Sequence, residues 1–268
     1  MAGPLRLGAA ADRTPGAAAA LSRSPRLHGR SRADPHRRGG GVTTETQALL
    51  AAFQHADSFF PGGATAFSWG LETLVSDGVI GDAASVEVYL RAQITHRWST
   101  SDLPMLQAAL LAREDETRLI ELDHLLDAMS LAARQRIGST RCGAALLSVH
   151  MRLGSAAATS YRGLVSRGDA LGHLPIVQGL VWGEMGLSLP IASAISANSL
   201  CQSIVSAAIR LGIVSHIDSQ LIIGRLRPVI ATAIDGDVPA ADQSHAYIPQ
   251  SEIALMRHEI QDNRLFAN

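Results

Sequence analysis

Apolar side chains recur every three or four positions along most of the chain after residue 43, which is the spacing of helices that bury one face. Leu119, Leu122, Leu126 and Met129 form the clearest stripe of this kind. Turns rich in Gly, Pro and Asp interrupt the pattern and divide it into segments. The pattern contains no β-hairpin signal and no internal repeat, so it predicts an all-α, bundle-like domain of about ten helices.

The predicted helices are separated by recognisable start and stop residues. Asp82 is a predicted N-cap, and Ser101 or Asp102 can cap the next helix with Pro104 in its first turn. The predicted helices run from Thr44 to before Phe60, from about 65 to 75, from Asp82 to about 98, onward from Ser101 or Asp102, through 119–129, and over about 139–153, 157–167, 174–186, 190–210, 218–234 and 249–262.

The segment 190–210 is the most apolar of these helices. Polar residues such as Ser193, Asn198 and Gln202 interrupt it, whereas a membrane span is an uninterrupted apolar run. We therefore predict a buried central helix and no membrane association.

Residues 1–42 differ in composition from the rest of the chain. They are rich in Gly, Ala, Pro, Arg and Ser, and they carry eight Arg against Asp12 and Asp34. We predict a disordered extension over 1–42 and a helical domain over 43–268. The domain carries an excess of acidic residues, whereas a nucleic-acid footprint would need a basic folded domain, so no nucleic-acid partner is predicted.

Composition also argues against several kinds of chemistry. The chain contains no Lys, which excludes a Walker A loop and Schiff-base chemistry. Cys142 and Cys201 are isolated and are expected to be small buried side chains. No two of the ten His share a helical spacing, and neither an HExxH nor a GxSxG motif is present. The sequence therefore predicts no metal site, no catalytic residue and no bound cofactor.

Two segments stand out from this background. The first is a Gly-rich turn within 57–72, where Phe59, Phe60, Phe67 and Trp69 make up half of all Phe and Trp in the chain. Such a turn either anchors the first two helices by packing or offers an aromatic contact surface. The second segment is 256–268, whose Arg-Leu-Phe sequence is unusually apolar for a free tail. We expect that tail to dock on its own domain or on a partner.

The same segments carry a family resemblance. FFPGGATAFSWGLE, from Phe59, resembles the N-terminal signature of urease accessory protein F (UreF), and MRHEIQDNRLFAN, from Met256, is similar to the close of that family. His173-Leu-Pro-Ile-Val-Gln-Gly179 and the region 199–220 resemble two further family segments in the right order. The resemblance covers about residues 47–268.

The resemblance implies an all-α, cytoplasmic protein that is not an enzyme. Members of the family are expected to dimerise, to bridge the accessory protein UreD (also called UreH) and the GTPase UreG, and to regulate GTP-dependent nickel insertion into the urease apoprotein. Two other functions stay open at this stage. One is a helical hydrolase that uses His and Ser side chains, and the other is a direct nickel carrier.

Candidate partner-binding residues follow from the resemblance and from position, and they fall into three groups. The turn contributes Phe60, Gly63, Ser68, Gly70, Leu71 and Glu72. The tail contributes Arg257, His258, Glu259, Arg264, Leu265 and Phe266. Polar positions on the central helices contribute Gln178, Gln202, Arg210 and Gln220.

Overall fold

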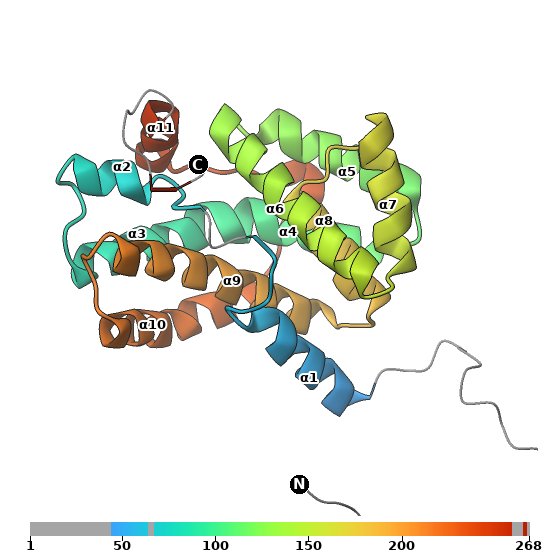
Figure 1. The fold of residues 1–268 in the computed structure, drawn as a ribbon, viewed down its shortest axis with the longest axis horizontal. Coiled ribbons are helices and arrows are strands. Elements are labelled where there is room, and N and C mark those ends of the chain that lie inside the picture. The colour runs from blue at the N-terminus through green and yellow to red at the C-terminus, as the bar shows by residue number, and fades with distance from the viewer. Residues whose placement is uncertain (1–43, 64–66, 259–264, 267–268) are drawn as a thin grey trace, which may run out of the picture. The chain divides into compact units, whose positions relative to one another are not determined.

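The computed structural model describes residues 44–63, 67–258 and 265–266, and all regular structure in these residues is helical (Figure 1). The elements are α1 (Glu45–Ala56), α2 (Leu71–Ser76), α3 (Ala83–Gln93), the π-helix η2 (Ile94–Asp102), α4 (Leu103–Leu111), α5 (Glu116–Met129), α6 (Ala133–Arg152), α7 (Ala156–Arg167), α8 (Leu174–Glu184), α9 (Leu189–Arg210), α10 (His216–Asp235), the 3₁₀ turn η3 (Ala241–Gln243) and α11 (Pro249–His258). This confirms the all-α prediction. The extension predicted over 1–42 lies outside the described residues.

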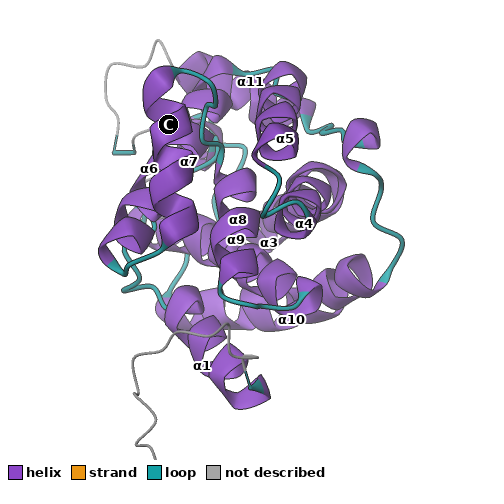
Figure 2. Cartoon of the chain, turned by 90° about the vertical axis from the view of Figure 1, so that its right-hand side faces the viewer, coloured by secondary structure: helices purple, strands orange, loops and turns teal. Residues whose placement is uncertain are grey.

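Two apolar clusters form the core, and α9 contributes to both. One cluster gathers side chains from α2, α3, η2 and α10, and the other gathers side chains from α4 to α8. Figures 1 and 2 show α9 running through the middle of the helical assembly. It is the one described helix long and apolar enough to cross a membrane, but 67% of its most apolar window is buried within the fold. This burial is what a core helix requires, as predicted from its polar interruptions.

The helix starts follow local capping chemistry. Thr44, Asp82 and Ser215 each form a capping box, in which the N-cap side chain accepts a bond from a backbone N–H that the helix leaves unpaired. Pro190 lies in the first turn of α9. Gly212 follows that helix in the left-handed region, with φ of 74°. These boundaries agree with the predicted ones.

A close approach between α4 and α8 depends on Gly179. A Cβ atom at this position would lie 2.4 Å from the carbonyl oxygen of Leu106 and 2.7 Å from the Cβ of Ala109. Any side chain would therefore push the two helices apart. Gly179 belongs to one of the segments that carry the family resemblance, and its role there is packing.

The predicted break at Ser101 or Asp102 is wrong. The chain continues without interruption from α3 through η2 into α4, and Asp102 has helical dihedral angles and forms no cap. The backbone N–H of Leu103 bonds to the carbonyl of Trp98, five residues earlier, which is the π-helical pattern. The Asp102 carboxylate instead pairs with Arg97, at 3.0 Å.

Two other helix starts differ from the prediction. The second helix begins at Leu71 and not near residue 65, because Trp69 and Gly70 both have positive φ angles that no α-helix accommodates. The helix predicted from about residue 139 begins at Ala133.

Candidate functional site

The aromatic turn is partly packed and partly exposed. Phe67 and Trp69 are buried, Phe60 is half-buried, and Phe59 is 92% exposed. Packing is therefore the correct interpretation for Phe67 and Trp69, and Phe59 remains available to solvent.

The backbone at Trp69 adopts an uncommon conformation. Its φ angle is 56°, in the left-handed region that bulky residues rarely occupy. The Trp69 carbonyl accepts hydrogen bonds from the Ser251 hydroxyl, at 2.9 Å, and from the Tyr89 hydroxyl. The Arg97 guanidinium lies 4.3 Å from the centre of the indole ring. Contacts from α3, η2 and α11 thus hold a conformation that the local sequence would not adopt alone.

Gly70 lets α11 approach this turn. Its φ angle is 89°, and a Cβ atom would lie 3.0 Å from the Ser251 carbonyl oxygen and 3.3 Å from the Ala254 Cβ. The turn and α11, far apart in sequence, are therefore in direct contact.

The Glu72 carboxylate joins the turn to the C-terminal segment. One oxygen lies 2.8 Å from Nε2 of His258, and the other accepts the backbone N–H of Leu265 at 2.6 Å. Glu72 is 7% exposed and His258 is fully buried. A buried carboxylate is tolerated only when its oxygens are paired, so these bonds tie the tail to the turn.

Arg210 holds the same segment from α9. Its guanidinium lies 4.2 Å from the centre of the Phe266 ring and donates to the Leu265 carbonyl at 3.4 Å. Phe266 is buried, whereas the Leu265 side chain is 63% exposed. Glu72, Arg210, His258, Leu265 and Phe266 together are called the tail clasp below.

The Nε2 atom of His258 faces Glu72, and its Nδ1 atom is buried with no hydrogen-bond partner among the described residues.

The structure places the predicted site residues in separate environments. Ser68 and Leu71 are buried, so they can act on a partner only by supporting the surface above them. Arg257 makes a two-pronged ion pair with Asp77 beside the clasp. Glu259 and Arg264 lie outside the described residues.

The polar candidates on the central helices are not part of the clasp, with the exception of Arg210. Gln202 donates to the Ala56 carbonyl at 3.0 Å, and Gln178 accepts from the Ser196 hydroxyl at 3.1 Å. A cavity beside α1 is lined by Phe60, Gly62, Gly63, Gln178 and Gln202. Gln220 is exposed on α10.

A buried pair of histidines, one of which lines this cavity, was not predicted from the sequence. The Nε2 atoms of His55 and His150 lie 3.2 Å apart, and both rings are buried beside Phe60. Burial lowers the pKa of His55, and burial together with the neighbouring His55 lowers the pKa of His150 to about 4. The two residues are 95 positions apart, so no spacing rule could reveal the pair. The described residues contain no group of three or more His, Cys, Asp or Glu that could hold a metal ion.

These features define an all-α protein whose aromatic turn contacts α11 and Leu265. A family model of UreF matches residues 80–227. The chain is 30% identical over 226 residues to the urease accessory protein UreF of Bacillus sp. (strain TB-90), covering 81% of this chain and 98% of that protein. It is 32% identical over 220 residues to the UreF of Arthrobacter sp. (strain FB24), covering 81% and 96%. The chain belongs to the UreF family of urease accessory proteins, which confirms the resemblance.

Proposed function

We propose that this protein acts in the cytoplasm as a dimeric scaffold in urease maturation. It bridges UreD/UreH and the GTPase UreG, and it regulates GTP-dependent nickel insertion into the urease apoprotein. Membership of the UreF family supports the urease accessory role. The partners and their order of assembly are the proposed part.

The observation that carries the proposal is the position of Leu265 and Phe266 at the tail clasp. The clasp holds these two residues on the domain while the Leu265 side chain stays exposed. On α11, Ile253 and Met256 are 56% and 42% exposed and are three residues apart, so they share one helix face. Exposed apolar side chains on a fixed frame suit a protein-binding surface. We assign this surface to UreD/UreH.

The test is capture of purified UreD/UreH by the full chain and by variants. Leu265→Ser changes an exposed side chain, but its backbone bond to Glu72 is retained. We expect Leu265→Ser combined with Met256→Ser to weaken capture at least about tenfold, which is the scale of a central interface residue. Deletion of 256–268 should abolish capture.

Leu111→Ser is the matched control, because Leu111 is 68% exposed on α4, away from the tail sequence. It should capture UreD/UreH as well as the original chain does. Undiminished capture by both the double variant and the deletion would refute the assignment of the tail surface.

Two alternatives predict different results from the same purified protein. A direct nickel carrier would hold one tight Ni²⁺ per chain in equilibrium dialysis, and His55→Gln should abolish that binding if the histidine pair is responsible. A helical hydrolase would turn over esters or amides in a general screen. The scaffold proposal expects neither result.

A further inference from the structure

The helices α6 and α7 are basic, whereas the rest of the domain is acidic. Between Asp127 and Asp169 the chain contains six Arg and no acidic residue. The remainder of 43–268 contains nine Arg and 22 acidic residues. Because α6 and α7 pack against each other, this segment places its positive charge in one region of the fold.

Only the two ends of the basic segment form ion pairs with the acidic residues that border it. Arg136 lies 3.7 Å from Asp127, and Arg167 lies 2.8 Å from Asp169. Three Arg between these ends form no ion pair among the described residues: Arg141, Arg152 and Arg162. The middle of the segment therefore keeps its positive charge.

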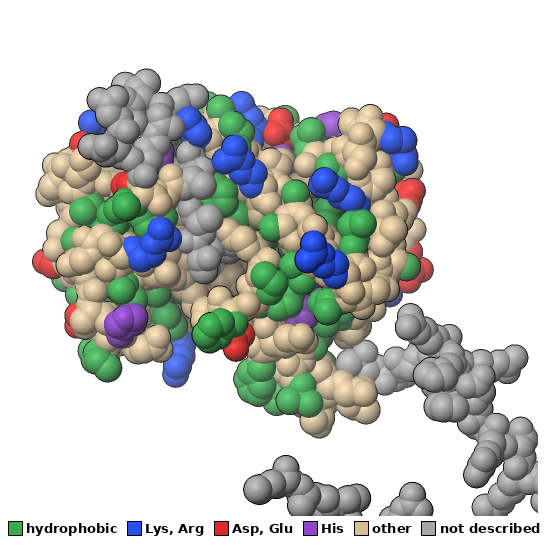
Figure 3. All heavy atoms as spheres, in the orientation of Figure 1, with side chains coloured by type: hydrophobic (Ala, Val, Ile, Leu, Met, Phe, Trp, Pro, Cys, Tyr) green, Lys and Arg blue, Asp and Glu red, His purple; other side chains and the backbone are tan. Residues whose placement is uncertain are grey.

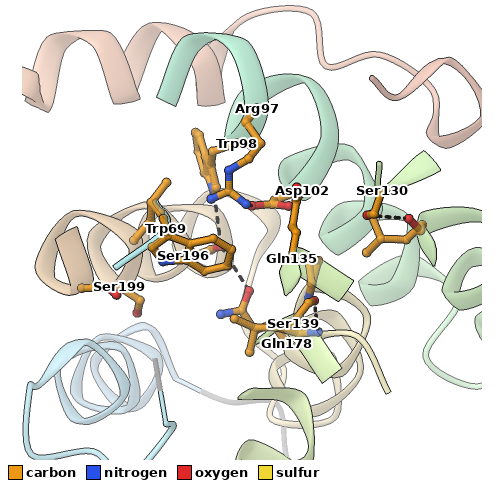
Figure 4. A pocket seen from close by; sticks show the side chains of 15 residues that line it. Trp69, Arg97, Trp98, Asp102, Ser130, Gln135, Ser139, Gln178, Ser196 and Ser199 are labelled. Carbon is orange, nitrogen blue, oxygen red and sulfur yellow. Dashed lines mark hydrogen bonds and ion pairs between the residues drawn. The ribbon is translucent and has the colours of Figure 1, made fainter. Parts of the chain in front are cut away.

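The interior of the fold treats positive charge differently. Figure 4 shows Arg97 and Asp102 joined beside a small cavity, where their side chains lie 3.0 Å apart. Arg97 is 6% exposed, and a buried charge is costly unless it is paired. Arg141 and Arg152 are exposed, so water solvates them and the fold does not need to pair them. Their charge is available to another molecule.

The exposed charges of α6 lie on one face of the helix. Arg141 and Arg152 are eleven residues apart, which is about three helical turns, so they point the same way about 16 Å apart along the axis. Ile137, one turn before Arg141, and Met151, next to Arg152, are 40% and 38% exposed. Figure 3 shows basic and apolar side chains on the side of the molecule where Figure 1 places α6. These four residues are called the α6 face below.

A second copy of the chain does not suit the α6 face. In a two-fold symmetric interface both subunits use the same patch. Arg141 and Arg152 would then approach the Arg residues of the other copy, and like charges in an interface are unfavourable. The complementary surface must therefore be acidic and belong to a different molecule.

Nucleic acid suits the face less well than an acidic protein does. Duplex DNA carries one charge per about 1.7 Å of its axis and is bound through many basic contacts. The α6 face offers two exposed Arg, and the domain outside α6 and α7 has an excess of 13 acidic residues that would repel phosphates. Apolar side chains beside charges suit a protein helix, which can present both kinds of side chain on one face.

We propose that the α6 face binds an amphipathic helix of a partner protein that carries acidic residues beside apolar ones. The acidic residues pair with Arg141 and Arg152, and the apolar residues cover Ile137 and Met151. Exposed ion pairs contribute little free energy each and are screened by salt, so the binding is weak and sensitive to salt. The α6 face shares no residue with the tail clasp or with the surface assigned to UreD/UreH.

A peptide of three Glu-Ala-Ala-Leu-Glu-Ala-Ala repeats tests the proposal on the full chain. Its Glu and Leu side chains recur every three or four positions, so they share one helix face. A benzophenone side chain in place of the central Leu forms cross-links on illumination, and mass spectrometry locates them. We expect cross-links within 137–152 that decrease as the salt concentration rises. Cross-links confined to the Arg-rich residues 1–42, or found nowhere, would overturn the proposal.

Two further molecules test the chemistry of the partner. The same peptide with Lys in place of every Glu should form no cross-links within 137–152. An oligothymidylate of about the same charge as the Glu peptide should compete less well than the unlabelled Glu peptide does. Equal cross-linking of the Lys peptide, or stronger competition by the oligothymidylate, would show that the face does not select an acidic helix.

Two double variants with the same change in net charge localise the contact. Arg141→Glu combined with Arg152→Glu reverses the charge of the α6 face and should reduce cross-linking within 137–152 at least about tenfold. Arg118→Glu combined with Arg227→Glu reverses two exposed Arg on α5 and α10 and should leave it unchanged. Circular dichroism checks that both variants are folded. Equal cross-linking by the two variants, whether reduced or not, would overturn the assignment to α6.

Discussion

Glu72 is a buried carboxylate whose two oxygens hold two different parts of the C-terminal segment. Hydrogen bonds to charged groups contribute about 1.5–3 kcal/mol each, and removal of one partner also leaves the other without its bond. Loss of this one side chain therefore removes the bonds to both His258 and Leu265. Its position one residue after Leu71, at the start of α2, makes the aromatic turn a support for the tail.

Glu72→Gln tests this support directly. An amide presents one acceptor and one donor, so it cannot accept from both His258 and Leu265. We expect a loss of about 2–3 kcal/mol in the free energy of unfolding, measured by urea denaturation, and faster hydrogen exchange at the Leu265 amide. Glu114→Gln, at an exposed side chain, is the control and should change neither quantity. Unchanged exchange at Leu265 would contradict the clasp.

A comparison of Gly70→Ala with Gly78→Ala separates the cost of backbone strain from the cost of the contact with α11. Gly70 and Gly78 both have positive φ angles, of 89° and 72°, but only Gly70 has neighbours within reach of a Cβ atom. We expect Gly78→Ala to cost about 1 kcal/mol from strain alone, and Gly70→Ala about 2–3 kcal/mol because α11 must also move. Thermal denaturation of the two variants measures the difference. Equal losses would show that the contact with α11 adds nothing.

At the scale of elements, α1 is attached through the histidine pair. His55 lies near the end of α1 and His150 near the end of α6, and both rings have lowered pKa values. The other titratable group acting on His150 is Glu184 of α8, which raises its pKa less than burial and His55 lower it. Contacts between α1 and the body of the protein should therefore weaken in acid.

The sign of the pH effect follows from the proton balance. The pKa of His150 is about 4 in the folded chain and 6.5 ordinarily, so the unfolded chain binds more protons between these values. The contribution of His150 to the free energy of unfolding is therefore present above pH 6.5 and is lost as the pH decreases towards 4. The free energy of unfolding of the original chain should fall between pH 7.5 and 4.5. We expect His150→Gln to make this fall smaller by on the order of 2 kcal/mol, measured by urea denaturation. His216→Gln, on the exposed start of α10, should leave the pH dependence unchanged.

Some of the helices could be predicted from the sequence, and others could not. Start signals such as Asp82 and Pro190 act within a few residues, so the helices that carry them could be located from sequence. The π-helix could not be located from sequence, because Arg97 and Asp102 are five residues apart. Residues at this spacing share a helix face only where the backbone forms π-helical hydrogen bonds. The two halves of the clasp were both singled out, but their pairing spans 186 residues and has no local signal.

At the scale of the whole described domain, the apolar surface is uneven. On α1 the small residues Ala48 and Ala51 face inward, whereas Leu49, Leu50 and Phe53 are 49%, 61% and 63% exposed. Figure 3 shows apolar side chains gathered where α1 projects from the other helices. A helix that exposes its larger apolar residues is a candidate for an interface between subunits.

We expect this face of α1 to be covered in the proposed dimer. Leu50→Ser combined with Phe53→Ser should shift the protein from dimer towards monomer, because the pair removes two large apolar side chains from the exposed face of α1. Sedimentation velocity measures the change, and Leu111→Ser serves as the control at a similarly exposed position on α4. A variant that stays dimeric at the same concentration would place the subunit interface elsewhere.

The clasp also has a consequence for synthesis on the ribosome. Leu265 lies 193 residues after Glu72, so nearly all of the helical domain is translated before the carboxylate receives its final bond. Translation that stops before Leu265 leaves this carboxylate short of a partner. Such shortened products should be cleaved faster by proteases than the chain that contains Leu265.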